Sequence, residues 1–462
     1  MLLLRRILAA GTLAALLALA GAPGLASQAG AQETPAKMAK PSQTNPAPAA
    51  GAKQTSEVNK GPRSDQAYSL PPDKLVQAKA LNRIRVWVAI AGSVWDLVVL
   101  WVLLVTGSAT RLDVWTRETL RSRWVQGVGF FGLVLVILAV ADLPLGIVAH
   151  TASLKYHVSV QPWGAWFVDY AKELGVSLAI GVPVALLLNW VVRRSPRGYW
   201  MWTWLISLPL ILVSVFLAPL VLDPIFNKFS PLEASHPALA AKLEEVVART
   251  GTRIPPERMF LMKASEKSNG INAYVTGIGS SKRFVMWDTT MDRMPDDEIM
   301  FIFGHESGHY VLNHIPKGLA FMMVGLLFLF WACAHIAEWM VRRFGESWRV
   351  SAVGSRTGFV VLFFAFSIGN FVATPIANKV SRNFEHEADV YGQEAIHGLV
   401  ADPRKTAVSA FNHMGEAWLE DPAPNAFVEF WMDSHPSVQQ RADFAEHYDP
   451  WANGRVGEFF TK

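Results

Sequence analysis

A short run of residues, His305-Glu306-Ser307-Gly308-His309, has the residue types and the spacing of a metal-dependent hydrolase. Residues four apart lie on one face of an α-helix, so both imidazoles can bind the same cation. Two neutral histidine ligands leave that cation strongly Lewis-acidic. The carboxylate of Glu306 can then take a proton from a zinc-bound water and later deliver it to the leaving amine. The run therefore indicates zinc-dependent peptide hydrolysis, with Glu306 as the base.

A catalytic zinc site needs a third protein ligand. The metzincin pattern would place a histidine at the position of Ile315, and His314 is one residue out of register and is expected to point away from the other two histidines. A glutamate on a later helix is the alternative, and Glu385 is the predicted third ligand. Asp389, four residues further on, can accept the free N–H of a ligand histidine without binding the metal itself. His386 remains a rival ligand.

The elements that position these groups follow from the apolar and turn patterns. Asp296–His314 is predicted to be one helix, because the acidic run at 295–298 is typical of a helix N-terminus. A later helix over Asn378–Ala395 carries the third ligand, and an amphipathic helix is expected at 236–250. Three short strands are predicted at Arg258–Met262, Ala273–Thr276 and Phe284–Trp287, with Gly277, Gly279, Ser280 and Ser281 in the turn between the last two.

Six apolar runs are long enough to cross about 30 Å of hydrocarbon. They are Val86–Thr106, Trp124–Val148, Gly175–Val192, Trp200–Val221, Leu319–Met340 and Gly358–Ile376. Arginines concentrate in the loops 107–123, 193–199 and 341–357, which the positive-inside rule places in the cytoplasm. Segments 223–318 and 377–462 then lie together on the outer side. Because each segment is small alone, we expect the two to form one domain.

The composition agrees with a membrane protein. Of 462 residues 51% are apolar and only 17% are charged, and the mean hydropathy is +0.23. A net charge of +4, from 42 basic and 38 acidic residues, gives no argument for a nucleic-acid partner. The single cysteine, Cys333, excludes an intrachain disulfide, a cysteine-rich zinc finger and an iron–sulfur cluster. The predicted fold class is mainly α, a polytopic helical membrane protein with about six spans and a small α+β domain that has a short β-sheet.

The N-terminus has the three parts of a secretory signal peptide: Arg5 and Arg6, the apolar stretch Ile7–Ala20, and an A-x-A site at 29–31. A retained signal-anchor helix is the alternative, and both place the following residues outside the cytoplasm. The next segment lacks aromatic residues and is rich in Ala, Pro, Gln, Ser and Lys, which is typical of a disordered linker. The predicted organisation is a signal peptide at 1–31, a linker at 32–66, four spans at 67–222, the first part of the peptidase domain at 223–318, a membrane hairpin at 319–376 and the second part at 377–462.

Three charged residues are left open by the sequence. Arg382 could pair with Asp389 or with another carboxylate. Asp96 and Asp142 fall within apolar runs, where an ionisable side chain is costly and often functional. For both aspartates a polar contact toward a wet interior is the favoured interpretation.

These motifs, in this order, resemble the integral-membrane zinc CAAX prenyl proteases of type I. The resemblance runs from about Tyr68 to the C-terminus. Besides the metal motifs it includes Tyr68-Ser69-Leu70-Pro71-Pro72, Asp169, Lys172, the run 223–232, Asn272-Ala273-Tyr274, Gly277, Gly279, Lys282-Arg283, Asp288-Thr289, Asn313-His314, Pro375, Asn378, Ser381-Arg382, Ala388-Asp389 and Ser434-His435-Pro436 with Arg441.

The resemblance implies a barrel of transmembrane helices around a large water-filled chamber, with one zinc site facing the chamber. It implies that His305, His309 and Glu385 bind Zn²⁺, one ion per chain, and that Glu306 is the general base.

The resemblance also implies how a peptide or protein substrate is held. Asn272-Ala273-Tyr274 would be an edge strand that pairs with an extended substrate by strand addition. His435 would stabilise the oxyanion of the tetrahedral intermediate. The alternative for His435 is a packed histidine at a helix start, beside Pro436.

This chain departs from the family in one respect that bears on the substrate. The family usually has seven spans, and the predicted signal peptide stands where the first span would be, which turns the site to the outer face. Eukaryotic members process prenylated CAAX tails on the cytosolic side, so the chemistry transfers to this chain better than the substrate does.

We therefore predict a zinc metalloendopeptidase in a bacterial-type inner membrane, with its catalytic domain on the periplasmic side. Peptides or unfolded protein segments are the expected substrates, in CAAX-protease-like processing or in quality control, and the lipid bilayer is the expected surroundings. Processing of lipid-modified C-terminal peptides is one alternative. A non-catalytic chamber or scaffold with a structural zinc is another, although a structural site has no use for the carboxylate of Glu306.

Overall fold

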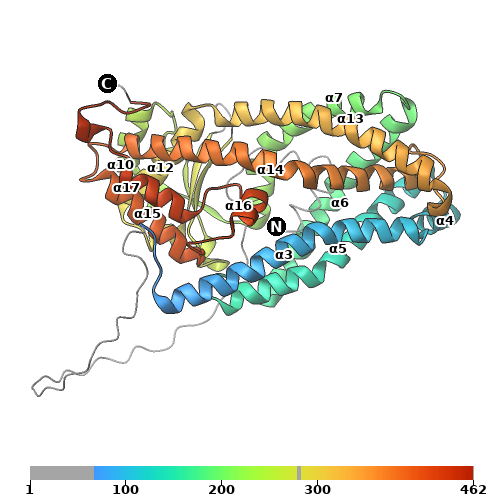
Figure 1. Ribbon diagram of the computed structural model, residues 1–462, viewed down its shortest axis with the longest axis horizontal. Coiled ribbons are helices and arrows are strands. Elements are labelled where there is room, and N and C mark those ends of the chain that lie inside the picture. Colours follow the sequence, from blue (N-terminus) through green and yellow to red (C-terminus); the bar gives the residue numbers. More distant parts are fainter. Residues whose placement is uncertain (1–66, 278–281, 461–462) are drawn as a thin grey trace, which may run out of the picture.

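The computed structural model describes residues 67–277 and 282–460 of the chain. Long helices run side by side through most of the molecule, and a small sheet with several shorter helices lies at one end (Figure 1). The predicted signal peptide and linker, and the turn residues 278–281, lie outside the described residues. The two parts correspond to the predicted membrane region and the predicted α+β domain.

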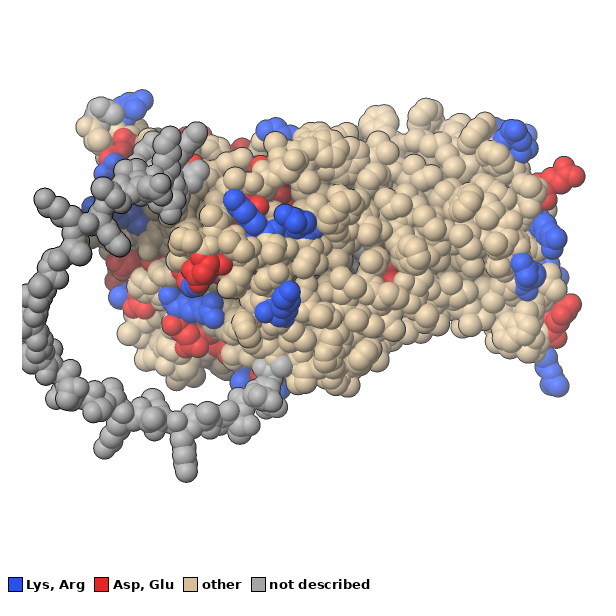
Figure 2. Space-filling model, turned by 60° about the horizontal axis from the view of Figure 1, so that its bottom comes forward, with Lys and Arg blue, Asp and Glu red and all other residues tan. Residues whose placement is uncertain are grey.

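Five helices of the described chain are long and apolar enough to cross a membrane. They are α3 (Pro72–Val105), α5 (Arg123–Lys155), α6 (Trp163–Arg194), α13 (His314–Trp348) and α14 (Arg356–Ala395). A bent pair of helices adds a sixth crossing if the pair is counted as one span. On the face shown in Figure 2, charged side chains gather toward the two ends and are scarce in the long zone between them. The chain is an integral membrane protein.

The predicted fourth span, Trp200–Val221, is not one continuous helix. Helix α7 (Tyr199–Leu217) passes into a π-helical turn at Ala218–Leu222 and then into α8 (Asp223–Phe226). The two halves are bent by 44°. Pro219 lies in this turn and has no N–H to donate to the preceding turn, which accounts for the break.

The last predicted span and the predicted third-ligand helix are one helix. Residues 358–376 and 378–395 both belong to α14, which has 40 residues and continues through Pro375. The loop expected at 107–123 contains α4 (Ser108–Thr119). Asp113 of α4 pairs with Arg356 at the start of α14, with 2.8 Å between Oδ1 and Nη1. The predicted metal ligand Glu385 is therefore carried on the extension of a membrane span.

The sheet has four strands in the order β1-β2-β4-β3. The three predicted strands are confirmed as β2 (Met259–Met262), β3 (Ala273–Thr276) and β4 (Arg283–Trp287), while β1 (Phe229–Pro231) was not predicted. Strand β2 is parallel to β4, and the other neighbours are antiparallel. Strand β3 is an edge strand, so one side of its backbone is free of sheet partners.

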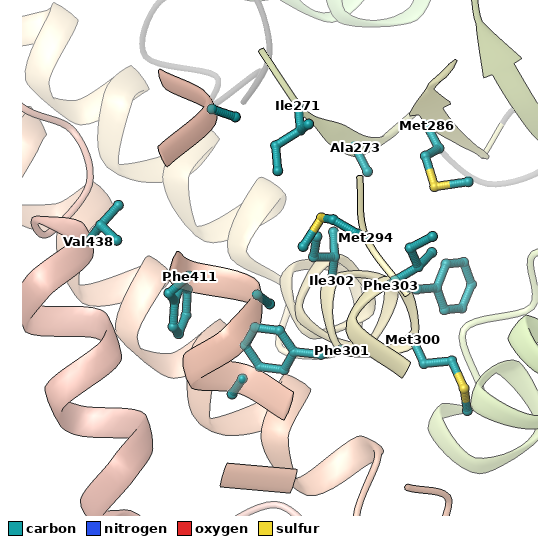
Figure 3. Close-up of a cluster of buried hydrophobic side chains, with 14 of the residues drawn as sticks. Ile271, Ala273, Met286, Met294, Met300, Phe301, Ile302, Phe303, Phe411 and Val438 are labelled. Atoms are coloured by element: carbon teal, nitrogen blue, oxygen red, sulfur yellow. The ribbon is translucent and has the colours of Figure 1, made fainter. Parts of the chain in front are cut away.

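The shorter helices surround the sheet. They are α9 (Leu232–Ser235), α10 (Pro237–Thr250), α11 (Asp288–Met291), α12 (Asp296–Val311), α15 (Pro403–Trp418), α16 (Ala426–Met432) and α17 (Val438–His447). Helix α12 is buried at every position from Glu298 to Gly308. Figure 3 shows its apolar side chains between the sheet and α15, where the rings of Phe301 and Phe411 meet edge-on with centroids 5.3 Å apart. Each such buried side chain contributes about 1.5–3 kcal/mol of transfer free energy.

Candidate metal centre

The helix that carries the first motif begins and ends at recognisable residues. Pro295 has extended backbone angles before α12, and the acidic residues of the first turn suit the positive end of the helix dipole. The predicted helix over 296–314 is split, because Asn313 takes a left-handed conformation with φ of 58°. Asparagine tolerates that conformation better than most residues. His314 is therefore the first residue of α13 rather than the last of α12.

Helices α12 and α14 cross at close range, and glycines make the crossing feasible. A Cβ atom on Gly392 would lie 2.8 Å from the backbone nitrogen of His305, and one on Gly308 would lie 3.0 Å from Cβ of Tyr391. Neither contact leaves room for a larger side chain. The close approach brings the histidines of α12 against the carboxylate of Glu385 on α14.

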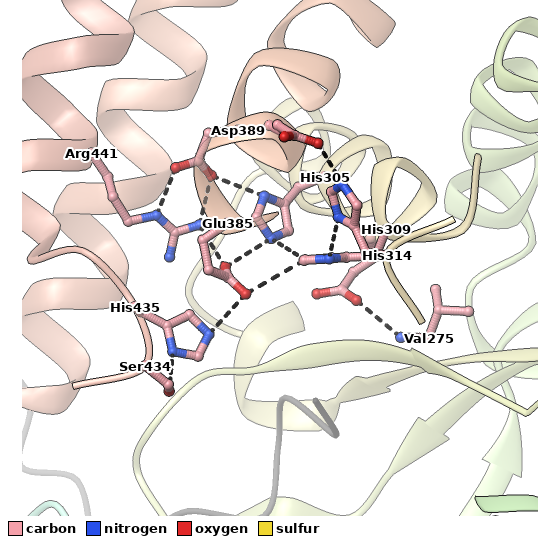
Figure 4. Close-up of polar contacts among 11 residues, drawn as sticks. Val275, His305, His309, His314, Glu385, Asp389, Ser434, His435 and Arg441 are labelled. Atoms are coloured by element: carbon pink, nitrogen blue, oxygen red, sulfur yellow. Dashed lines mark hydrogen bonds and ion pairs between the residues drawn. The ribbon is translucent and has the colours of Figure 1, made fainter. Parts of the chain in front are cut away.

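The three predicted ligands meet at one point (Figure 4). Nε2 of His305 lies 3.2 Å from Nε2 of His309 and 3.4 Å from Oε2 of Glu385, and Nε2 of His309 lies 3.6 Å from Oε1 of Glu385. Zinc bonds of about 2.0–2.1 Å in a tetrahedral arrangement hold ligand atoms about 3.3 Å apart. The residues present therefore fit a zinc ion.

The back of the His305 ring faces a buried ion pair. Nδ1 of His305 lies 2.9 Å from Oδ1 of Asp389, so the predicted contact between this aspartate and a histidine of the motif is present. Asp389 receives two hydrogen bonds from Arg441, at 2.9 Å from Nε and 2.6 Å from Nη2. The open question about Arg382 is answered differently: its guanidinium donates to the backbone carbonyls of Glu429 and Asp433.

The back of the His309 ring faces His314, and the prediction that His314 points away was wrong. The two Nδ1 atoms are 3.1 Å apart, and Nε2 of His314 lies 2.9 Å from Oε2 of Glu387. The prediction treated both histidines as part of one helix. The left-handed residue Asn313 turns the chain and brings His314 back against His309. His386, the rival ligand, is exposed and packs edge-on against Phe444.

Glu306 lies between the metal-ligand cluster and the sheet. Its Oε2 accepts a hydrogen bond of 3.1 Å from the backbone N–H of Val275 on β3. Burial raises the pKa of Glu306 to about 7 and lowers the pKa of His309 to about 3. With a pKa of about 7, Glu306 can both take and give a proton near neutral pH.

The backbone of β3 alternates between the sheet and the site. Trp287 of β4 donates its N–H to the carbonyl of Asn272, so Asn272, Tyr274 and Thr276 turn their backbone groups toward β4. Ala273 and Val275 turn theirs outward. Of the three residues predicted to bind substrate, only Ala273 therefore presents its backbone at the free edge.

A cavity of about 80 Å³ adjoins these groups. His305, Glu306, Glu385 and His435 line it together with apolar side chains from β3, α12 and α15, among them Phe301, Phe411 and Met414. His435 is 42% exposed, and its Nε2 lies 3.3 Å from Oε1 of Glu385. The site thus joins a candidate metal centre to a small, mainly apolar pocket.

Sequence reasoning missed two partners of the site. Arg441 was part of the family resemblance without an assigned role, and Glu387 was not among the predicted site residues. The two aspartates that the sequence left open are on membrane helices and do not line the cavity of the candidate site. Asp142 is buried in α5 and Asp96 is partly buried in α3, and each has an interaction partner in the protein.

Comparisons with known proteins agree with this arrangement. Residues 233–449 match the model of peptidase family M48, and residues 54–228 match the model described as CAAX prenyl protease N-terminal, five membrane helices. An uncharacterized metalloprotease of Bacillus subtilis, YhfN, is 32% identical over 390 residues, which cover 84% of this chain and 89% of that protein. CAAX prenyl protease 1 of Saccharomyces cerevisiae is 28% identical over 288 residues, which cover 58% of this chain and 62% of that protein.

A solved structure shares the fold. The crystal structure of S. mikatae Ste24p matches with a TM-score of 0.71, over 85% of this chain and 93% of that chain, at 21% sequence identity. The match spans both the membrane helices and the domain that holds the candidate metal centre.

Proposed function

Because the chain belongs to peptidase family M48 and is a membrane metallopeptidase related to the CAAX prenyl proteases, we propose that it is a zinc-dependent endopeptidase acting at the site between α12, α14 and β3. One observation carries the proposal. The carboxylate of Glu306 lies beside the His305, His309 and Glu385 cluster and is held there by the backbone of an edge strand. A structural metal site would need no such carboxylate, which counts against the scaffold alternative.

His305, His309 and Glu385 would hold one Zn²⁺ through Nε2, Nε2 and a carboxylate oxygen. Their separations of 3.2–3.6 Å support this assignment. Three protein ligands leave one coordination position open, as in catalytic zinc sites. When bound, the ion acts as a Lewis acid that polarises the scissile carbonyl group.

Glu306 is the general base of the proposed mechanism. It takes a proton from the attacking water and transfers it to the nitrogen of the leaving amine when the peptide bond breaks. The hydrogen bond from Val275 orients the carboxylate. Burial raises its pKa to about 7, so the group can take up and release a proton near neutral pH. His435 faces the same cavity from the loop after α16 and would donate a hydrogen bond to the oxygen that gains charge.

The substrate would lie extended along β3. The outward N–H and C=O of Ala273, with the C=O of Val275, can pair with the backbone of a peptide, and these main-chain hydrogen bonds can form with any sequence. The apolar walls from α12 and α15 would accept one apolar side chain of that peptide. Peptides and unfolded segments are therefore the proposed substrates.

We place the site on the periplasmic side of a bacterial-type inner membrane. The arginine-rich segments 107–123, 193–199 and 341–357 lie at the ends of the spans opposite the sheet, and the positive-inside rule makes those ends cytoplasmic. Processing of lipidated C-terminal peptides is the second candidate function, favoured by the relatives that are named CAAX prenyl proteases.

The first experiment compares the wild type with Glu306→Gln in detergent, measuring bound zinc and peptide cleavage on the same samples. Glu306→Gln removes the base and no ligand, so it should keep about one zinc per chain and lose cleavage. Glu244→Gln, an exposed glutamate on α10, is the matched control. Undiminished cleavage by Glu306→Gln would refute the mechanism.

A second experiment separates the two candidate substrates. It compares cleavage of a prenylated and an unmodified peptide of the same sequence by the wild type.

A further inference from the structure

We propose that His314 and Glu387 are positioning residues that hold the ligand His309 through a chain of two hydrogen bonds. The proposal rests on the proposed metal site and names the residues behind its second histidine. Nδ1 of His309 lies 3.1 Å from Nδ1 of His314, and Nε2 of His314 lies 2.9 Å from Oε2 of Glu387. Three helices, α12, α13 and α14, contribute one residue each, and the facing rings of the two histidines are visible in Figure 4.

The direction of both hydrogen bonds follows from the atoms involved. The nitrogen of His309 that faces the carboxylate of Glu385 is Nε2, at 3.6 Å from Oε1. A neutral imidazole has one N–H, so a ring that gives its Nε2 lone pair to a metal carries its proton on Nδ1. That N–H donates to Nδ1 of His314, which must then carry its own proton on Nε2 and donate it to Glu387. Each N–H in this pair of hydrogen bonds therefore has an acceptor.

Packing fixes the middle ring of the chain. His314 is 3% exposed, and its ring stacks on Phe384 with centroids 4.5 Å apart and planes 10° apart. The left-handed conformation of Asn313 aims the start of α13 back toward α12. The ring therefore has little freedom to turn away from His309, which is what a residue that sets the orientation of a ligand requires.

The two histidine ligands are supported in different ways. His305 is backed by the buried pair of Asp389 and Arg441, whereas His309 is backed by a neutral ring whose partner carboxylate, Glu387, is 41% exposed. Since partners of this kind typically change metal affinity by about 10–100-fold, both sides of the site contribute to holding the ion. The His309 side is the one that reaches solvent.

His314→Phe tests the proposal most directly, because it keeps a ring to stack on Phe384 and removes the hydrogen-bond acceptor. We expect zinc affinity, measured by competition with a chelator, to fall about 10–100-fold, and the visible absorption spectrum of the Co²⁺-loaded protein to change. His314→Asn, whose side-chain oxygen can accept in place of Nδ1, should recover most of the affinity. His386→Phe, the same change at an exposed histidine of α14, should bind zinc as the wild type does.

A second variant tests whether the residues act as a chain. Glu387→Leu removes the terminal acceptor and should weaken zinc binding less than His314→Phe, and the double variant should lose no more than His314→Phe alone. Additive losses would contradict a chain. Wild-type zinc affinity in His314→Phe that is folded, as judged by its melting temperature, would overturn the inference and leave the metal site standing. A wild-type protein that binds no zinc would overturn the proposed metal site itself, and this inference with it.

Discussion

Arg441 of α17 and Asp389 of α14 form a buried two-point ion pair behind the candidate metal centre. The guanidinium also lies 3.7 Å from Oε2 of Glu385. One cation thus neutralises the partner of His305 and stands next to the predicted carboxylate ligand. The ion pair thus joins two residues that are 52 positions apart in the sequence.

Arg441→Leu should be strongly destabilising, because it leaves the charge of Asp389 buried without its partner. Losing one member of a buried pair costs about 3–5 kcal/mol. Chemical unfolding of the purified protein measures the loss. Arg404→Leu, which removes partly exposed pairs with Asp402 and Asp449, is the control and should cost about 1 kcal/mol or less. Equal losses in the two variants would contradict the importance of the buried pair.

Glu306→Gln should stabilise the metal-free protein at alkaline pH. The pKa of Glu306 in the folded protein is about 7, above its usual 4.5, so its stabilising contribution is complete below pH 4.5 and is lost as pH rises through 7. Glutamine does not ionise and escapes this loss. Melting temperatures of chelator-treated protein should differ at pH 8 in favour of Glu306→Gln and converge at pH 5. A difference that is independent of pH would contradict the buried carboxylate, and Glu244→Gln should show none.

N-methylation of a substrate peptide, one residue at a time, should block cleavage with a period of two. Only Ala273 and Val275 turn backbone groups to the free edge of β3, so only alternate amides of a paired peptide meet the strand. Methylation of the amide that faces Ala273 should raise KM, and methylation of its neighbours should change it little. The measurement is steady-state cleavage of the peptide series. A uniform effect along the peptide would contradict strand addition.

His435→Ala should lower kcat and leave bound zinc unchanged. A donor that stabilises developing negative charge is worth about 10²–10³-fold in rate. His435→Gln retains a donor and should recover part of the rate. Zinc analysis of each variant is the control, because His435 also lies 3.3 Å from Glu385. A loss of zinc in His435→Ala would show that the residue supports the ligand set instead.

The orientation of the chain can be read with single cysteines in a Cys333→Ala background. Ser235 is exposed beside the sheet, and Ser347 is exposed at the far end of α13. A membrane-impermeant maleimide should label Ser235→Cys in spheroplasts and Ser347→Cys only after lysis. The reverse pattern would place the site in the cytoplasm.

Several of these elements could be predicted from the sequence because their signals are local. The three longer strands follow from short apolar runs bounded by turn residues, and the spacing of the HESGH run and of Glu385 to Asp389 is set by the helix repeat. Strand β1 could not be predicted, since three residues that end in Pro231 carry no alternating pattern. The break at Pro219 was missed because the run around it is apolar throughout.

The partners of the site residues depend on contacts between distant segments. No local pattern links Arg441 to Asp389, and the meeting of His314 with His309 depends on the backbone conformation of one residue, Asn313. The prediction of one unbroken helix over 296–314 made His314 point away from His309, which was wrong. These contacts therefore could not be predicted without the fold, whereas the meeting of His305, His309 and Glu385 was predicted from the helix spacing and the need for a third ligand.

The length of α14 has a consequence for which bonds the enzyme can reach. From Arg356 to Glu385 the helix rises about 44 Å, whereas the hydrocarbon layer is about 30 Å thick. If the start of the helix lies at one surface of that layer, the continuous helix would hold the candidate metal centre beyond the opposite surface. A protein anchored in the same membrane would then be cut at a fixed distance from its own hydrophobic segment, so that the enzyme selects bonds by depth as well as by sequence.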